Sequence, residues 1–202
     1  MGRPRTPLLS ADRIADAALE LVNTTGGFTM PALAARLGVR PSSLYNHVAG
    51  RDAIVELLRE RAMSEVELPS VDPDEPARPW RNAVADIARS YRRSYARYPR
   101  LIPLLTAYSV NSASAITMYN TLAATLVRAG FDHAETLRVI TLIDYLVLGS
   151  ALDVAAPEEP WLTSAEVGPE FAAALATATP NPQRADDVFE YGLSVLLAGL
   201  EP

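Results

Sequence analysis

The sequence predicts an all-α protein in which a small N-terminal helix-turn-helix unit precedes a larger helical domain. Apolar residues recur at helical spacing along most of the 202-residue chain, and no stretch shows the alternation that is typical of a strand. Four prolines and several acidic residues interrupt this pattern between 69 and 79, where no helix can continue. We therefore expect four regions: a head (1–50), a connecting helix (51–68), a Pro-rich acidic loop (69–79) and a helical body (80–202).

The head is expected to begin with two helices. The first covers residues 10–25, where a serine supplies the start and Gly26-Gly27 ends the apolar pattern. The second begins after Thr29, whose hydroxyl is placed to accept a free backbone N–H as an N-cap. Phe28 and Leu33 hold the two positions of a hydrophobic staple, which would fix how the chain enters this second helix.

Residues 33–48 are the most informative segment because they predict two short helices joined by a tight turn at Gly38. Apolar side chains at Leu44 and Val48 would hold the second of these helices from behind, which leaves its polar side chains with no role in the core. A helix that is polar outward and anchored behind can enter the major groove of DNA, as in a helix-turn-helix.

The candidate DNA contacts divide by their chemistry. Arg40 and Asn46 are predicted to contact base edges, because Arg pairs well with guanine and Asn with adenine. The remaining hydroxyl, imidazole and guanidinium groups suit phosphate oxygens, which position a protein without specifying sequence. The predicted DNA-binding set is Thr29, Arg40, Ser42, Ser43, Tyr45, Asn46, His47 and Arg51.

This segment resembles the N-terminal domain of the tetracycline-repressor (TetR) family of bacterial transcriptional regulators, over residues 8–68. The matching string is Leu33-Ala34, Leu37-Gly38-Val39, Leu44-Tyr45, His47-Val48 and Arg51. The resemblance implies DNA contacts at Ser43, Tyr45, His47 and Arg51. The chain departs from the pattern at Met30 and Pro31, where some relatives carry polar DNA-contacting residues, and at Asn46, where others often carry a bulkier aromatic.

The resemblance also implies partners. Family members pair their last long helices across a two-fold axis, so the chain is expected to form a homodimer that binds a palindromic DNA operator. A small-molecule effector would bind in the body and release the repressor from DNA. Relief by the ligand is the common mode in the family, and ligand-assisted DNA binding stays open as an alternative.

Charge agrees with DNA binding at one end of the molecule. The whole chain carries a net charge of −6, but residues 1–50 sum to +2 and the remainder to −8. A mildly basic head on an acidic body directs nucleic acid to the head. Arg3 and Arg5 could form an arm on DNA, and an unstructured leader is an equal alternative.

The body is predicted to be helical throughout. The expected elements are a helix from Trp80 to about Pro99, a short piece over 99–105, a helix from Ser112 to Gly130, a helix over 132–155, a loop from Pro157 to Pro169, a weak helix over 170–178 and a last helix over 184–200. Asp132 and Glu135 resemble a capping box at the start of the fourth of these elements.

Two helices are predicted to form the dimer interface, namely 132–155 and 184–200. Val139–Leu152 is apolar nearly all round, which a surface helix of a monomer would not be. Gly192 and Gly199 lie seven residues apart on one face of the last helix and indicate close helix approach. A monomer with one buried central helix is the alternative.

An effector site is predicted from tyrosine hydroxyls on apolar helices, because an apolar cavity with a few polar groups is what a small-molecule site requires. Asp144 is the strongest candidate, since a buried carboxylate needs a cationic or hydrogen-bonding partner. The alternative is that the tyrosines are ordinary core residues. The predicted ligand-binding set is Tyr91, Tyr95, Tyr108, Asn111, Met118, Tyr119, Asp144 and Tyr145, and the cluster Arg89, Arg92, Arg93, Arg97 and Arg100 is predicted to be a solvated face.

Other classes of protein are disfavoured by composition. The chain has two histidines, no cysteine and no Gly-rich phosphate loop, so no catalytic residue, metal site or cofactor is predicted, and an all-helical enzyme is the weaker hypothesis. An adaptor that has lost DNA binding is a second rival. The start of the chain lacks a signal peptide, and the longest apolar run is too short to cross a bilayer, so we expect a cytoplasmic protein without membrane contact.

Overall fold

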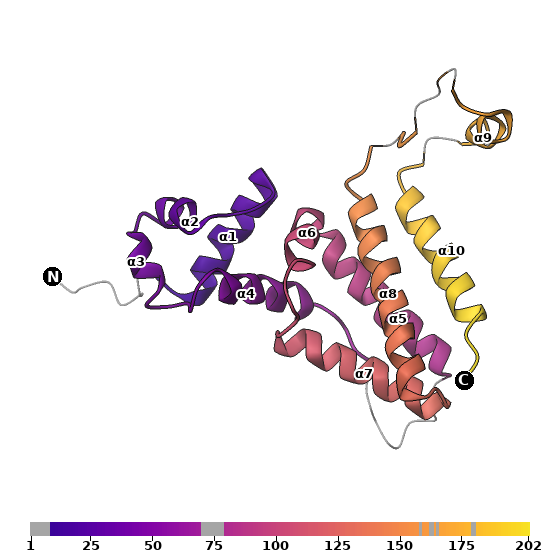
Figure 1. Cartoon of the computed structure of the whole chain (residues 1–202), viewed down its shortest axis with the longest axis horizontal. Coiled ribbons are helices and arrows are strands. Elements are labelled where there is room, and N and C mark those ends of the chain that lie inside the picture. Colours follow the sequence, from indigo (N-terminus) through magenta and orange to yellow (C-terminus); the bar gives the residue numbers. More distant parts are fainter. Residues whose placement is uncertain (1–8, 70–78, 158, 162–163, 165, 179–180) are drawn as a thin grey trace.

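The computed structural model describes residues 9–69, 79–157, 159–161, 164, 166–178 and 181–202. Within these ranges every regular element is a helix, which confirms the predicted all-α class. Figure 1 shows the head at one end of an elongated molecule and a bundle of longer helices at the other. The predicted arm at Arg3 and Arg5 and most of the Pro-rich loop lie outside the described residues.

The head contains three helices, and a fourth connects it to the body. Ser10 and Thr29 are N-caps whose hydroxyls accept the Arg13 and Ala32 N–H groups at 3.3 and 3.2 Å. Gly38 takes the left-handed conformation (φ 68°) that the tight turn requires, which explains why glycine stands there. The helices are α1 (Ala11–Thr25), α2 (Met30–Leu37), α3 (Pro41–Leu44) and α4 (Arg51–Met63).

Two of these helices are shorter than the sequence predicts. After α3 the chain continues in turns, in which the His47 and Val48 N–H groups both donate to the Leu44 carbonyl, at 2.9 and 3.0 Å. Helix α4 stops at Met63 rather than at residue 68. The cause is a tertiary contact, because the Glu67 N–H donates to the Ser90 hydroxyl at 2.8 Å instead of extending the helix.

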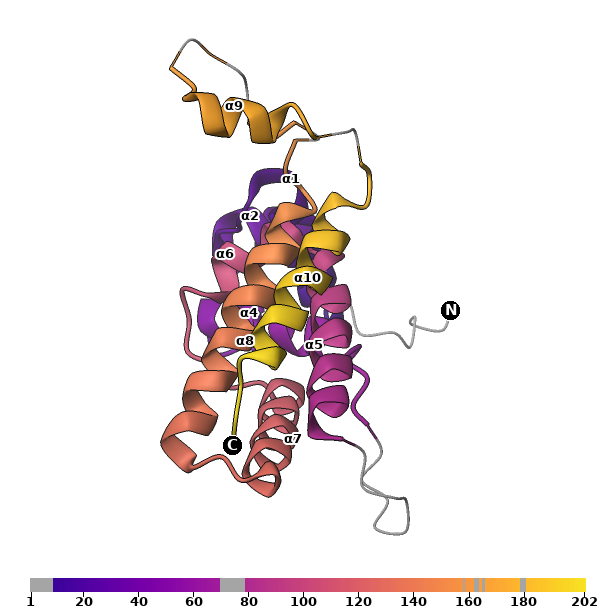
Figure 2. The same cartoon turned by 90° about the vertical axis from the view of Figure 1, so that its right-hand side faces the viewer.

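The body packs α5 against α7 and α8, and α8 against α10, as Figure 2 shows from the bundle side. Ser112 caps α7, and Asp132 caps α8 as expected, with its carboxylate accepting the Glu135 N–H at 2.7 Å. The elements are α5 (Trp80–Ala96), η1 (Pro99–Leu101), α6 (Ile102–Leu105), α7 (Ala113–Ala129), α8 (His133–Asp153), α9 (Pro169–Leu175) and α10 (Arg184–Ala198). Helix α9 has no buried residue and projects from the bundle in both views.

The two glycines of the last helix have different roles. A Cβ atom built on Gly192 would lie 2.9 Å from Leu146 Cδ1, so this glycine permits the close approach of α10 to α8. Gly199 is the C-cap of α10, and a Cβ atom there would meet only carbonyl groups of its own last turn. Within the protomer, a second helix therefore approaches closely at Gly192 and not at Gly199.

Candidate DNA interface and effector site

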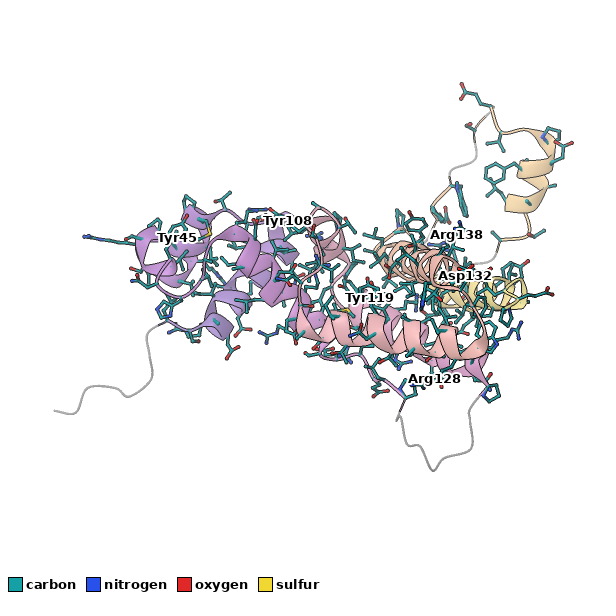
Figure 3. The ribbon with its side chains drawn as sticks, turned by 60° about the horizontal axis from the view of Figure 1, so that its bottom comes forward. Tyr45, Tyr108, Tyr119, Arg128, Asp132 and Arg138 are labelled. Carbon is teal, nitrogen blue, oxygen red and sulfur yellow. The ribbon has the colours of Figure 1, made fainter. Side chains whose placement is uncertain are left out.

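The predicted DNA-reading segment presents a polar surface on an apolar base. Leu44 is fully buried and Val48 is 7% exposed, so they anchor the segment to the core of the head. Tyr45, by contrast, is 57% exposed at the tip of the molecule, where Figure 3 labels it. Arg40, Ser42, Asn46 and His47 are also exposed, whereas Ser43 is half-buried. Thr29 is exposed as well, although its hydroxyl is engaged as the α2 cap.

Arg51, the last residue of the predicted DNA-binding set, makes contacts within its own chain. Its guanidinium stacks over the Phe28 ring, 4.6 Å from the centroid, and donates to the Phe28 carbonyl. Its Nε atom donates to the Tyr108 hydroxyl at 2.9 Å. A guanidinium that binds an aromatic face and two oxygens of its own chain joins the head to the body.

Helix α4 strengthens this head–body joint through polar contacts with the segment that leads into α7. The buried Arg59 donates to the Leu105 and Tyr108 carbonyls at 2.9 and 3.1 Å. Glu56 accepts the Asn111 N–H at 2.8 Å, and Glu60 accepts the Ser114 N–H at 2.9 Å. Because these partners are mostly backbone atoms, α4 fixes the backbone conformation of the segment between α6 and α7.

A groove of about 1000 Å³ lies at the same joint, between α4 and residues 107–113. Tyr108 and Asn111 line it together with the acidic side chains of α4. These two predicted ligand residues therefore lie at the head–body joint and not beside Asp144. In Figure 3, Tyr108 is labelled nearer to the head than Tyr119.

The interior of the body does bring other predicted ligand residues together. The Tyr119 hydroxyl on α7 donates to both carboxylate oxygens of Asp144 on α8, at 3.2 and 3.1 Å. Tyr91 on α5 lies close enough to influence the pKa values of both groups. The Tyr91 and Tyr95 rings meet edge to face with centroids 5.2 Å apart. We call Tyr91, Tyr95, Tyr119 and Asp144 the tyrosine–aspartate cluster.

Burial governs the protonation of this cluster. Desolvation raises the pKa of Asp144 to about 6 and outweighs the hydrogen bonds from Tyr119 and Tyr91, which lower it. Desolvation also raises the pKa of Tyr95 to about 12 and raises the pKa values of Tyr91 and Tyr119, whose phenols therefore stay neutral and donate. Met118 is fully buried and also lines a small pocket of about 180 Å³.

The exposed apolar face of α8 and α10 is the third notable surface. Tyr145, a residue of the predicted ligand-binding set, is 71% exposed on this face and lies apart from the buried tyrosines. The periodicity of α8 explains this position, because α5, α7 and α10 cover its other sides. The exposed apolar residues of the face are Leu137, Leu142, Tyr145 and Leu152 on α8, and Val188, Tyr191 and Val195 on α10.

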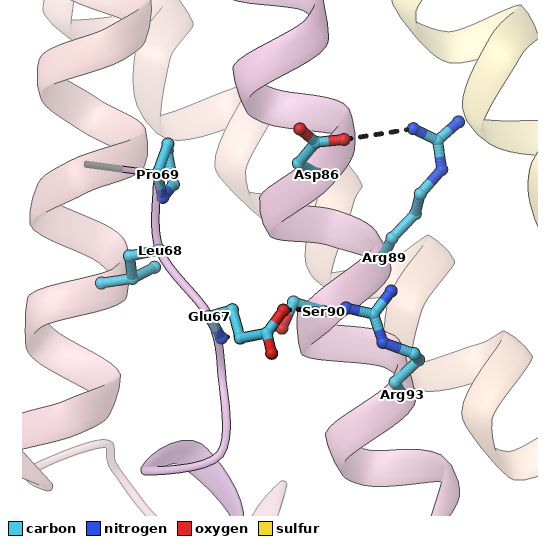
Figure 4. A pocket seen from close by; sticks show the side chains of 7 residues that line it. All are labelled: Glu67, Leu68, Pro69, Asp86, Arg89, Ser90 and Arg93. Atoms are coloured by element: carbon cyan, nitrogen blue, oxygen red, sulfur yellow. Dashed lines mark hydrogen bonds and ion pairs between the residues drawn. The ribbon is translucent and has the colours of Figure 1, made fainter. Parts of the chain in front are cut away.

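The arginines on and after α5, predicted to form a solvated face, include residues that make specific contacts. Arg92 is only 6% exposed, donates to the Ser150 hydroxyl at 2.7 Å and pairs with Asp186. Arg89 pairs with Glu190 at 2.7 Å, and Arg97 pairs with Glu65. Arg89, Arg93 and Glu67 also line a surface pocket of about 260 Å³, drawn in Figure 4. The prediction of a solvated face is therefore wrong for Arg92, whereas Arg93, Arg97 and Arg100 are exposed as predicted.

Sequence reasoning missed the α4 contacts of Glu56, Arg59 and Glu60. Their spacing places them on one side of the helix, and this is the signal that could have been used. Within the described part of the chain, no group of three metal-binding side chains occurs. In the same ranges, no helix is long and apolar enough to cross a membrane.

Comparison with known proteins agrees with this architecture. The family model of the tetracyclin repressor-like C-terminal domain matches residues 72–202. The tetracycline repressor class A from transposon 1721 of Escherichia coli is 28% identical over 204 residues, covering 95% of this chain and 90% of that protein. The transcriptional repressor DrrR1 of Streptomyces coeruleorubidus is 30% identical over 148 residues, covering 72% of this chain and about half (53%) of that protein.

Solved structures show the same fold. ActR of Streptomyces coelicolor in complex with actinorhodin superposes with a TM-score of 0.73 at 23% identity, covering 96% of this chain and 97% of that one. TetR from Acinetobacter baumannii AYE superposes with a TM-score of 0.65 at 26% identity, covering 95% and 96% of the two chains. Because the family model covers well over half of the sequence, the chain belongs to the TetR (tetracycline repressor) family of transcriptional regulators.

Proposed function

We propose that this regulator is a homodimeric repressor that binds a palindromic operator through its two heads and leaves it when a small molecule enters the body. The observation that carries the proposal is the polar surface around Tyr45, exposed and anchored by Leu44 and Val48. The division of labour follows the predicted regions, with DNA read by residues 1–50 and the effector and dimer contacts supplied by residues 80–202.

The proposed DNA contacts are the exposed polar residues of the motif. Arg40 and Asn46 would contact base edges, and the hydroxyl and imidazole groups would contact phosphates. Arg51 is left out of this set because its guanidinium is held by Phe28 and Tyr108. The proposed set is Thr29, Arg40, Ser42, Ser43, Tyr45, Asn46 and His47.

The apolar face of α8 and α10 supports the dimer. A contiguous exposed apolar surface marks an interaction site, and two adjacent helices of one protomer can complete a four-helix bundle with the same pair of a second copy. A two-fold dimer of this kind presents two heads to half-sites about one helical turn apart.

The effector would bind at the tyrosine–aspartate cluster, with Met118 beside it. Structures of this fold have been solved with small molecules bound, namely ActR in complex with actinorhodin and a TetR variant of Acinetobacter baumannii in complex with minocycline. Binding in the body can be transmitted through the α4 contacts to the head, with a coupling free energy on the order of 1–3 kcal/mol.

Fluorescence anisotropy with the DNA upstream of the protein's own gene, or with an operator selected from random oligonucleotides, tests the proposal. The wild type should bind specifically, and Tyr45→Ala and His47→Ala should each weaken binding at least tenfold. Arg40→Ala should also weaken binding and relax the preference for the base pair that this residue contacts. Arg128→Ala is the matched control, since it removes the same charge from an exposed site at the other end of the molecule.

Binding that is no tighter than to random DNA, after selection from random oligonucleotides, would contradict the proposal. Equal losses of DNA affinity in the Arg40→Ala and Arg128→Ala variants would contradict the assignment of the DNA-binding surface to the head. An effector is then added to the protein–DNA complex. Release of the DNA identifies a ligand-relieved repressor, and tighter binding identifies a regulator whose DNA binding the ligand promotes.

A further inference from the structure

Asp144 is a partly buried carboxylate in the middle of α8, and in the part of the chain that the structure describes it has no ion pair. Asp153, the last residue of α8, pairs with Arg184 at 2.9 Å, and Asp186 pairs with Arg92. In the described ranges no arginine pairs with Asp144, whose hydrogen-bond donors are the neutral phenols of Tyr119 and Tyr91. A half-buried carboxylate without a counter-ion is costly, and the fold keeps it in the middle of α8.

Aromatic rings surround this carboxylate on the inner side. Tyr91 and Tyr95 are almost completely buried and pack edge to face, and Tyr119 reaches Asp144 from α7. The face of an aromatic ring attracts a cation, and tyrosine faces beside a carboxylate are the chemistry that recognises alkylammonium groups. Asp144 and Tyr119 are only partly covered, so they form the accessible edge of the cluster.

We propose that the tyrosine–aspartate cluster binds an organic cation at its accessible edge, with Asp144 as the counter-ion and the Tyr119 ring beside an alkylated ammonium group on an apolar or aromatic body. The inference rests on the proposed function, because it names the chemical class of the effector. A neutral hydroxyl compound could donate one hydrogen bond to Asp144 but would leave the carboxylate charge uncompensated. A cation neutralises that charge and also interacts with the aromatic side chain beside it, so both interactions favour its binding.

A pair of probes that differ only in charge isolates this effect. 3-(Trimethylammonio)phenol and its uncharged carbon isostere 3-tert-butylphenol have the same shape, and isothermal titration calorimetry at pH 7 measures their binding to the full chain without DNA. The wild type should bind the cation at least tenfold more tightly than the isostere. Asp144→Asn should abolish this preference, since the amide keeps the size and the acceptor oxygen and removes only the charge.

Asp153→Asn is the control for loss of a negative charge from the same helix, and it should keep the preference because Asp153 already has a partner in Arg184. Tyr119→Phe should keep the preference, since it retains the ring and removes only the hydroxyl, whereas Tyr119→Leu should reduce it. The melting temperature of each variant establishes that it is folded.

Failure of the cation to bind, equal binding of the two probes, or a preference that survives in Asp144→Asn would overturn the inference. Operator binding, measured separately by anisotropy for the same variants, distinguishes failure of the cation site from failure of the proposed function. A protein that binds its operator but ignores the cation is a repressor with another class of effector. A protein that binds the cation but no operator keeps the site and loses the repressor assignment.

Discussion

The Nε atom of Arg51 donates a 2.9 Å hydrogen bond to the hydroxyl of Tyr108, 57 residues later in the chain. Arg51 is the first residue of α4, and Tyr108 lies on the segment between α6 and α7. The bond therefore connects the helix that carries the head to the helical body. Arg100 makes a parallel connection, because it donates to the Asn23 carbonyl at the end of α1 at 2.6 Å. Through these contacts a change in the body can reach the head.

Tyr108→Phe is expected to lower the free energy of unfolding by about 1 kcal/mol, because it removes one partly buried hydrogen bond. Urea denaturation measures the change. Tyr45→Phe is the matched control and should change stability by less than about 0.5 kcal/mol, since it removes a hydroxyl from an exposed ring. Equal effects of the two substitutions would show that the contact with Arg51 does not stabilise the joint.

Asp144→Asn is expected to stabilise the protein at pH 7.5, by about 2 kcal/mol. The folded pKa of Asp144, about 6, is above its usual value of 3.8, so the fold binds this proton more tightly than the unfolded chain does. The wild type therefore loses stability as the pH rises from about 4 to about 6, and the variant does not. Chemical denaturation between pH 3.5 and 7.5 should show the two curves meeting at low pH. Parallel curves would contradict the raised pKa.

Glu60→Gln is expected to have the opposite pH dependence. Hydrogen bonds from Ser114 lower the pKa of Glu60 below its usual 4.5, so its ionised form stabilises the fold above that pH. The substitution should cost about 1 kcal/mol at pH 7, and the difference should shrink as the pH falls below 4. Glu20→Gln is the control, because the exposed pair of Glu20 with Arg36 should contribute little. A loss that is equal at pH 3.5 and pH 7 would contradict this account.

Tyr191→Glu and Tyr145→Glu are each expected to convert the dimer to a monomer in sedimentation velocity at micromolar concentration. Both rings are more than 70% exposed in the protomer, and a buried unpaired charge in an apolar interface costs several kcal/mol. Operator affinity should fall at least tenfold, since one head alone binds weakly. Val110→Glu, on the segment before α7, is the control for adding a charge at an exposed apolar site. Dimers that persist in both tyrosine variants would place the interface elsewhere.

The positions of most helices could be predicted from the sequence because the signals are local. Ser10, Thr29, Ser112 and Asp132 each cap the helix that follows, and the residues involved lie within one helical turn of each other. The positive φ of Gly38 likewise follows from the demands of a tight turn. The exposed apolar face of α8 agrees with the excess of apolar residues in Val139–Leu152, since a helix that is apolar all round needs partners on every side.

The partners of charged side chains could not be predicted in this way. The sequence has 18 basic and 24 acidic residues, and nothing local decides which of them meet. The packing of distant helices places Tyr108 beside Arg51 and Asp186 beside Arg92, and neither contact follows from the residues next to these arginines in the sequence. Tyr108 and Tyr145 were grouped with the buried tyrosines for the same reason, because composition does not show on which side of a helix a neighbour packs.

The sequence by itself determined the helices, their caps, the anchored reading segment of the head and the family to which the chain belongs. Helical periodicity and capping act within a few residues, so they are written directly in the chain. Only the tertiary structure decided the contacts that join head to body and the grouping of Tyr91, Tyr119 and Asp144. These depend on the relative positions of α4, α5, α7 and α8, which are set by burial of apolar surface across the whole bundle and not by any local pattern.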